Sequence, residues 1–229
     1  MHGLLTTAAP QCLECRTVVC AVPITQLQNS SIEFAPPLPA PKQAALQRVR
    51  MGTAVKVFGV FAEAFWPAGM WDVVCAHQPL PEIWMTRYPV EDVGHVGADV
   101  HCVTAFCTGD RARHLSALAA PEAVALLLKQ LNDMFGTPAD PRPAQRAFVR
   151  GYVRDWSKAP FIGGAYTHPT LGAKVGDRDL IAANVGGAVF FAGEHAQLDM
   201  NPCLQGAMET GVRAAVEALH ALKQPRSAL

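Results

Sequence analysis

The stretch Val189–Leu222 reads VFFAGEHAQLDMNPCLQGAMETGVRAAVEALHAL, and it is the most informative part of this chain. Residues Ala188 to Ala192 predict a short buried strand, which a Gly-Glu turn follows. A helix is then expected to open at Asn201 and Pro202, because asparagine caps helices well and proline suits the first helical position. Apolar residues recur along this helix as one stripe at helical spacing, at Leu204, Met208, Gly211, Val212, Ala215 and Leu219.

This strand and helix place two chemical features near each other. Glu194 stands at the strand end, and the helix N-terminus points back toward the same place. A carboxylate accepts hydrogen bonds from sugar or polyol hydroxyls, and the helix dipole favours negative charge on an electron-poor ring. The pair therefore suits a ligand that carries both groups.

The string FFAGEH followed by QGAMETGVRAA resembles the closing flavin-binding signature of the flavin-dependent amine oxidases. That family includes monoamine, polyamine and amino-acid oxidases and the flavin histone demethylases. The residues in register are Gly193, Glu194, Gly206, Ala207, Gly211, Arg213 and Ala214. The resemblance implies that Glu194 binds the ribitol of FAD and that the Leu204 amide stabilises negative charge near flavin N1 and the C2 carbonyl. It also implies flavin contacts from Val22, Trp156, Gly193 and Cys203.

The amino-acid composition of the chain excludes several classes of function. The chain has 229 residues, half of them apolar and 17% charged, which predicts a sizeable core rather than disorder. Its formal charge is zero without a basic stripe, so nucleic acid is not an expected partner. Lys56, Glu63 and Pro67 interrupt the best apolar run, so no membrane span is predicted. Seven scattered cysteines fit free thiols in a reducing, cytoplasmic compartment, and no metal site is expected.

Elsewhere the chain alternates predicted strands with a few helices. Helices are expected from Lys42 to Arg50, ended by Gly52, and from Pro121 to Phe135; GGAYTHPTLGAKVGD is expected to be an irregular connection. The predicted strands are Thr17–Val22, Thr53–Phe61, Trp71–Ala76, Ile83–Tyr88, Val100–Thr108 and Ala147–Val153. Mostly strands, closed by one strand–helix unit, predict an α+β fold.

Lys56 is the predicted catalytic residue. The string MGTAVKVFGVF resembles the family segment whose lysine reaches flavin N5 through a water. Because the neighbours of Lys56 on both faces of the strand are mostly apolar, its ammonium is expected to be partly desolvated. The alternative is a lysine that extends to water at a sheet edge.

The segment VRDWSKAPFIGGAYTHP also matches the family. The resemblance places Trp156 near the flavin and makes Tyr166 an aromatic wall of the substrate cavity, where it holds the amine. Two residues depart from monoamine oxidases: Ala165 replaces the cysteine that bonds the flavin, so FAD is expected to bind non-covalently, and Cys203 replaces a second aromatic wall. The triplet that includes His195, Gly-Glu-His, is closer to the polyamine oxidase and demethylase branch.

No G-x-G-x-x-G occurs in the sequence, although the family places this pyrophosphate-binding fingerprint near its N-terminus. The chain therefore resembles the C-terminal half of a truncated two-domain flavoprotein. Residues 1–29 are expected to form a residual strand of the FAD domain, residues 30–180 a mixed-sheet substrate-binding domain, and residues 181–229 the C-terminal strand and helix of the Rossmann-like FAD domain. A missing N-terminal FAD-domain chain is a candidate partner.

The implied function is FAD-dependent oxidation of a small-molecule amine: hydride transfer from the C–N carbon to flavin N5, imine hydrolysis, and reduction of O2 to H2O2. Whether the isolated chain is an active enzyme stays open. The alternatives are a related flavin oxidase or desaturase, against which Lys56 counts, and a non-catalytic interaction or structural remnant, or half of a split enzyme.

Overall fold

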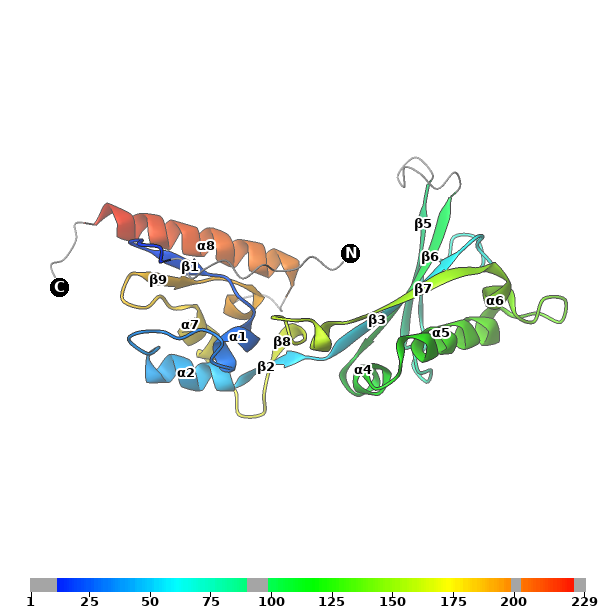
Figure 1. The fold of residues 1–229 in the computed structure, drawn as a ribbon, viewed down its shortest axis with the longest axis horizontal. Helices are drawn as coiled ribbons and strands as arrows, with labels where there is room; N and C mark the ends of the chain where they lie inside the picture. Colours follow the sequence, from blue (N-terminus) through cyan, green and yellow to red (C-terminus); the bar gives the residue numbers. More distant parts are fainter. Residues whose placement is uncertain (1–11, 90–98, 199–202, 225–229) are drawn as a thin grey trace. The chain divides into compact units, whose positions relative to one another are not determined.

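The computed structural model describes residues 12–89, 99–198 and 203–224, and its chain forms two compact units (Figure 1). Unit 1 combines Met1–Arg50 with Thr167–Leu229, and unit 2 is Met51–Tyr166. Parallel and antiparallel strand pairs both occur together with helices, which confirms the predicted α+β class. The functional boundaries expected at residues 29/30 and 180/181 stay a prediction.

Unit 1 contains a two-stranded parallel sheet between layers of helix. Strands β1 and β9 pair with Val19 opposite Phe190. Figure 1 shows α8 along one side of this pair, with α2 and α7 on the other. The elements are β1 (Val18–Cys20), α1 (Ile24–Gln28), α2 (Ala40–Gln47), α7 (Asp177–Ala182), β9 (Val189–Phe191), the short 3-10 helix η2 (Glu194–Ala196) and α8 (Leu204–Lys223).

The buried face of α8 consists of small residues, not of the apolar stripe read from the sequence. Its buried residues are Gly206, Thr210, Ala214 and Ala218, and the two alanines pack against Phe190 and Ala192. Small side chains let the helix approach the strands closely. The larger apolar residues are exposed: Leu204, Met208, Val212, Val216 and Leu219. The spacing therefore marked a true apolar face, but unit 1 does not bury it.

The start of α8 also differs from the expectation. The helix begins at Leu204, and Cys203 is its N-cap, with the Sγ atom accepting the Gly206 amide at 3.4 Å. Asn201 and Pro202, which were expected to open the helix, lie outside the described residues.

Unit 2 is an antiparallel sheet with helices on one face. The five strands lie in the order β4-β5-β6-β3-β7. Figure 1 shows α4, α5 and α6 beside this sheet. The elements are β3 (Ala54–Phe61), β4 (Asp72–Val74), β5 (Glu82–Tyr88), β6 (Val100–Thr108), α4 (Gly109–Ser116), α5 (Ala120–Phe135), α6 (Pro143–Ala147), β7 (Phe148–Asp155) and the 3-10 helix η1 (Trp156–Lys158). No described helix of the chain is long and apolar enough to cross a membrane.

Alternation along β3 decides which side chains join the core of unit 2. Val55, Val57 and Phe61 are fully buried and share one cluster with Leu127 and Leu131 of α5. Successive side chains of a strand point to opposite faces. The intervening residues of β3, including Lys56, are half-buried on the face opposite the helices.

Two elements contradict the sequence-based expectations. The helix expected to run to Arg50 ends at Gln47, and β2 (Val49–Gly52) follows it. β2 pairs with β8 (Ala165–Pro169), which lies inside the glycine-rich segment expected to be irregular. Pairing between segments more than 100 residues apart decides both structures, and tertiary context of this kind overrides local propensity.

Candidate functional site

The turn after β9 depends on Gly193. Its φ is +130°, and a Cβ there would lie 2.6 Å from Cε1 of His195, so the position requires glycine. The Gly193 amide donates to Oγ1 of Thr210 at 2.9 Å, and this hydroxyl lies 3.1 Å from the Gly193 carbonyl oxygen. These contacts fasten α8 to the end of β9.

Glu194 follows the glycine, and Thr167 orients its carboxylate. The Thr167 hydroxyl donates to Glu194 at 2.8 Å, and the Thr167 amide lies 3.2 Å from both carboxylate oxygens. Arg178 donates to the Thr167 hydroxyl at 3.1 Å and to the Glu194 carbonyl at 3.3 Å. A carboxylate offers roughly four acceptor positions. Glu194 is therefore held in place yet retains capacity for the hydroxyl groups of a ligand.

His195 is a buried, neutral imidazole. Its side chain is 2% exposed, and burial lowers its pKa to about 4, with smaller contributions from the positive charges of Arg178 and Lys42. Nε2 has no hydrogen-bond partner among the described residues. Buried polar atoms in native proteins nearly always bond to protein or ordered water. This atom is an unassigned polar group directly beside Glu194.

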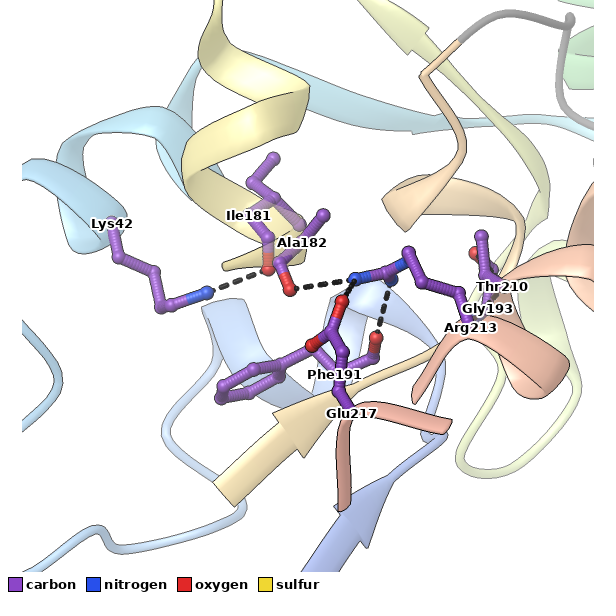
Figure 2. A network of polar contacts seen from close by, with 8 residues as sticks. All are labelled: Lys42, Ile181, Ala182, Phe191, Gly193, Thr210, Arg213 and Glu217. Atoms are coloured by element: carbon purple, nitrogen blue, oxygen red, sulfur yellow. Dashed lines mark hydrogen bonds and ion pairs between the residues drawn. The ribbon is translucent and has the colours of Figure 1, made fainter. Parts of the chain in front are cut away.

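Figure 2 shows a network centred on Arg213 that holds α7, β9 and α8 together. The guanidinium donates to the Phe191 carbonyl at 2.8 Å, to the Ala182 carbonyl at 3.2 Å and to the Glu217 carboxylate at 3.2 Å. Ala182 is the last residue of α7, whose terminal carbonyls lack partners within the helix. Arg213 therefore satisfies orphan carbonyls and fixes the strand that leads to Glu194.

Lys42 is the second cation at the end of α7 (Figure 2). Its Nζ donates to the Ile181 carbonyl at 2.6 Å and lies 3.9 Å from the centroid of the Phe191 ring. Burial, with a smaller contribution from the positive charge of Arg213, lowers its pKa to about 8. The sequence predicted only that Lys42 lies on a helix, because its contact partners, Ile181 and Phe191, are far away along the chain.

The first residues of α8 supply free amides. The first four amides of a helix have no partner within it, and they form the positive end of its dipole. Leu204, the first helical residue of α8, stands at this position with an exposed side chain. Cys203 lies beside it and caps Gly206. Val22, half-buried, lies between β1 and α1 of the same unit.

In unit 2, Lys56 lies over a pair of stacked aromatic rings. Its Nζ is 4.9 Å from the centroid of Trp84 and 5.5 Å from that of Phe106. The two rings are 5.4 Å apart and inclined by 23°. The Trp84 indole donates to the Glu82 carboxylate at 2.9 Å. Lys56 is thus half-buried and neighbours aromatic faces rather than a carboxylate, since no described residue forms an ion pair with it.

Trp156 and Tyr166 also belong to unit 2. Trp156 opens η1, and the Arg154 guanidinium lies 4.5 Å from the centroid of its ring. Tyr166 is 46% exposed and has a φ of +35°, an unusual value for a bulky residue. Burial raises its pKa, and the negative charge of Glu82 adds to this. Gly164 allows the chain just before Tyr166 to pack closely against Gly52, because a Cβ at Gly164 would lie 2.5 Å from the Gly52 carbonyl oxygen.

The structure therefore sorts the residues expected at the site into two sets. Val22, Gly193, Glu194, Cys203 and Leu204 lie in unit 1, and Lys56, Trp156 and Tyr166 lie in unit 2. Sequence reasoning missed the partners of these residues: Thr167, Arg178, Glu82, Trp84 and Phe106. Strand alternation was the one available signal, because it places Trp84 and Phe106 on the same kind of face as Lys56.

Comparison with known proteins supports one family. The family model described as flavin containing amine oxidoreductase matches residues 3–219. Lysine-specific histone demethylase 1 homolog 2 of Arabidopsis thaliana is 27% identical over 99% of this chain, which corresponds to 30% of that protein. The human peroxisomal N(1)-acetyl-spermine/spermidine oxidase is 29% identical over 93% of this chain and 45% of its own length.

Solved structures agree on the fold. Cyclohexylamine oxidase from Brevibacterium oxydans superposes with a TM-score of 0.74 at 20% identity, over 93% of this chain and 44% of that one. Wild-type putrescine oxidase bound to putrescine superposes with a TM-score of 0.72 at 24% identity, over 89% of this chain and 42% of that one. The chain thus spans less than half the length of each of these relatives. Since the family model matches residues 3–219 of 229, the chain belongs to the flavin containing amine oxidoreductases.

Proposed function

We propose that this chain takes part in the FAD-dependent oxidation of an amine. The observation that carries the proposal is the arrangement at the end of β9, where a carboxylate held by Thr167 and the fastened helix α8 follow a parallel strand. Ligands of open α/β sheets bind at the carboxyl ends of their strands. The family to which the chain belongs is flavin-containing.

The residues present fit one end of FAD. Glu194 has free acceptor positions for ribityl hydroxyls, and the positive end of α8 favours negative charge on an electron-poor ring. The unpartnered Nε2 of His195 adds a buried polar atom beside Glu194. The sequence contains no G-x-G-x-x-G segment for the pyrophosphate, so the fit covers only the flavin end. With Ala165 in place of a cysteine, the binding is non-covalent.

The candidate residues have different proposed roles. FAD, when bound, accepts the hydride from the carbon that bears the amine and passes the electrons to O2, which yields H2O2. Tyr166 and Trp156 hold the alkyl part of the amine and exclude water from it. The side chain of Lys56 positions the water that attacks the imine product, and hydrolysis releases a carbonyl compound together with ammonia or an amine. Glu194 and the Leu204 amide hold the cofactor.

Anaerobic mixing of the FAD-loaded chain with amines tests this proposal. The visible flavin absorbance is expected to bleach with an amine, and Lys56→Met is expected to slow the peroxide-forming turnover. Lys129→Met is the matched control, because Lys129 is exposed on α5 and forms an exposed ion pair with Asp133. No bleaching with any primary, secondary or acetylated amine would exclude amine oxidation by this chain.

The exposed face of α8 favours a second candidate, one half of a split enzyme. Leu204 is 77% exposed, and Met208 and Val212 are about two-thirds exposed at 66% and 67%. Apolar patches of this kind mark protein interfaces. The occupant would be a chain that carries the missing dinucleotide fingerprint. FAD binding that appears only after addition of such a chain would establish this candidate, and a monodisperse monomer that binds FAD alone would exclude it.

A further inference from the structure

Unit 1 contains a cavity that none of the residues assigned above to the cofactor or the amine lines. Its volume is about 430 Å³, and its walls come from α1, α2 and residues 29–39, which join these two helices (Figure 1). Ligand pockets of proteins have volumes of about 300–1,000 Å³ and are mostly apolar, with a few polar groups. The cavity is therefore a candidate site for a separate ligand.

The most deeply buried part of the lining is apolar. Leu38 and Leu46 are 8% and 2% exposed. Leu27, Ile32 and Phe34 line the cavity as half-buried side chains. Removal of apolar surface from water favours binding. This part of the cavity suits the hydrocarbon body of a ligand.

Two sets of contacts hold the segment between α1 and α2 in shape. Oδ1 of Asn29 accepts the Ser31 amide at 3.1 Å and the Ser31 hydroxyl at 2.6 Å. The centroid of the Phe34 ring lies 6.2 Å from that of Phe191, which is buried in β9. The wall that Phe34 forms is thus supported by the core of unit 1, as expected of a pocket that exists before its ligand binds.

Glutamine side chains supply hydrogen-bond acceptors to the cavity. Nε2 of Gln28 donates to the carbonyls of Leu46 and Val49, both at 2.6 Å. Nε2 of Gln43 donates to the Leu38 carbonyl, also at 2.6 Å. Since a carbonyl oxygen only accepts hydrogen bonds, these contacts identify the donor end of each side-chain amide. The two Oε1 atoms have no partner among the described residues and can accept from a ligand.

The charge of the lining is negative. Glu33 is an exposed carboxylate that forms no ion pair with a described residue, and no described lysine, arginine or histidine lines the cavity. The cations of α2 and its C-terminal end are engaged elsewhere. Lys42 donates to the Ile181 carbonyl, and Arg48 pairs with Asp177. The lining therefore favours a cation over an anion.

We propose that this cavity binds a small organic guanidinium that carries an apolar body. A guanidinium presents five N–H donors in one plane and can serve several acceptors at once, whereas an ammonium has three donors. Its charge is paired with Glu33, and its remaining donors bind Oε1 of Gln28 and of Gln43. Its apolar body packs on Leu38 and Leu46. The site requires neither FAD nor an amine substrate.

Three probes with the same phenyl group and matched length test the proposal on the full chain without FAD. They are 4-phenylbutylguanidine, which is protonated at neutral pH, N-(4-phenylbutyl)urea, in which a neutral carbonyl replaces the charged nitrogen, and 6-phenylhexanoate, which carries a carboxylate. Isothermal titration calorimetry measures their affinities. The guanidinium is expected to bind about fivefold more tightly than the urea, and the carboxylate no more tightly than the urea.

Substitutions locate the bound probe. Ile32→Trp fills the cavity and is expected to abolish binding, whereas Leu171→Trp adds the same indole at a fully exposed position and is expected to keep it. Glu33→Gln is expected to remove the preference for the guanidinium over the urea. Glu14→Gln, at an exposed carboxylate outside the lining, is expected to keep it. Circular dichroism reports whether each variant is folded, and Gln47→Trp, at an exposed lining residue, replaces Ile32→Trp if that variant unfolds.

Four results would overturn the site. They are no saturable binding of the guanidinium probe to the wild-type chain, binding that persists in the folded tryptophan variant of the cavity, a guanidinium preference that persists in Glu33→Gln, and binding of the carboxylate as tight as that of the guanidinium. Failure of the proposed function looks different, because amine oxidation needs FAD and these titrations do not. A chain that binds the guanidinium probe but never FAD would retain this site and lose the oxidase role.

Discussion

The hydroxyl of Thr167 donates a hydrogen bond of 2.8 Å to the carboxylate of Glu194, which lies 27 residues further along the chain. Thr167 is buried and receives a hydrogen bond from Arg178 in turn. The orientation of the proposed cofactor-binding carboxylate is therefore fixed by a residue of β8, a strand that the local sequence does not reveal.

Removing the Thr167 hydroxyl is expected to loosen Glu194. Thr167→Val keeps the shape but leaves Arg178 without one acceptor, so unfolding in urea is expected to show a loss of about 1–3 kcal/mol. FAD affinity is expected to fall with it. Thr170→Val is the matched control, because the Thr170 hydroxyl only accepts a surface amide, that of Gly172. Equal stability of Thr167→Val and wild type would contradict this role.

Arg213 is expected to be irreplaceable by lysine. Lysine lacks the planar fork that reaches the Phe191 carbonyl, the Ala182 carbonyl and Glu217 together. Arg213→Lys is expected to lower the free energy of unfolding by about 1–3 kcal/mol. Arg113→Lys alters an exposed pair with Asp110 and is expected to leave unfolding unchanged. Unfolding of both variants at the same urea concentration would contradict this role of Arg213.

His195 is expected to make the chain sensitive to acid. Its folded pKa of about 4 lies below the ordinary value of 6.5, so the unfolded chain binds a proton that the folded chain does not. Stability from this residue is present in full above pH 6.5 and is lost as the pH falls toward 4, by about 3 kcal/mol. The measurement is the free energy of unfolding between these pH values. His195→Gln is expected to flatten the profile, and an unchanged slope would contradict the assignment.

Lys42 is expected to make the stability of the chain depend on pH in the alkaline range. Its folded pKa of about 8 is below the ordinary value of 10.5, so burial penalises its charged form in full below pH 8. The unfolded chain binds the extra proton between pH 8 and 10.5, and the stability contribution of Lys42 therefore rises across that window. Lys42→Met is expected to lose this rise in urea unfolding curves. A rise of equal size in the variant would show that another group causes it.

Two glycines of α8 are expected to respond differently to substitution by alanine. A Cβ at Gly211 would meet nothing within 4 Å, so Gly211→Ala is expected to stabilise the isolated chain by about 0.5–1 kcal/mol. A Cβ at Gly206 would lie 3.0 Å from Cγ of Gln197, so Gly206→Ala gains less or loses stability. Thermal unfolding of the two variants compares them directly. A larger gain at Gly206 would contradict the packing of α8.

Local sequence patterns predicted the helices and strands whose structure depends mainly on the residues within them. A run of β-branched and aromatic residues located β3, and the predicted strand Val100–Thr108 has the bounds of β6. The resemblance in the closing stretch led to the family. Both signals are carried by neighbouring residues, so a single sequence suffices for them.

Local sequence patterns could not predict the elements that depend on contacts between distant segments. β2 and β8 form through each other, and α8 buries alanines because two strands approach it closely. The apolar residues predicted along α8 do lie on one face of the helix. Their burial depends on a partner surface that unit 1 does not provide. The same limit hid Thr167, whose role comes from its hydrogen bond to Glu194 on the turn after β9.

A titration of the purified chain with FAD tests the central claim most directly. Saturable binding with a resolved flavin spectrum is expected. Glu194→Gln is expected to weaken it about tenfold, through loss of one charged hydrogen-bond acceptor. Asp179→Asn, which removes an exposed carboxylate of the same unit, is expected to leave the affinity unchanged. Absence of saturable binding, or equal affinity of Glu194→Gln and wild type, would contradict the claim that these residues hold the flavin.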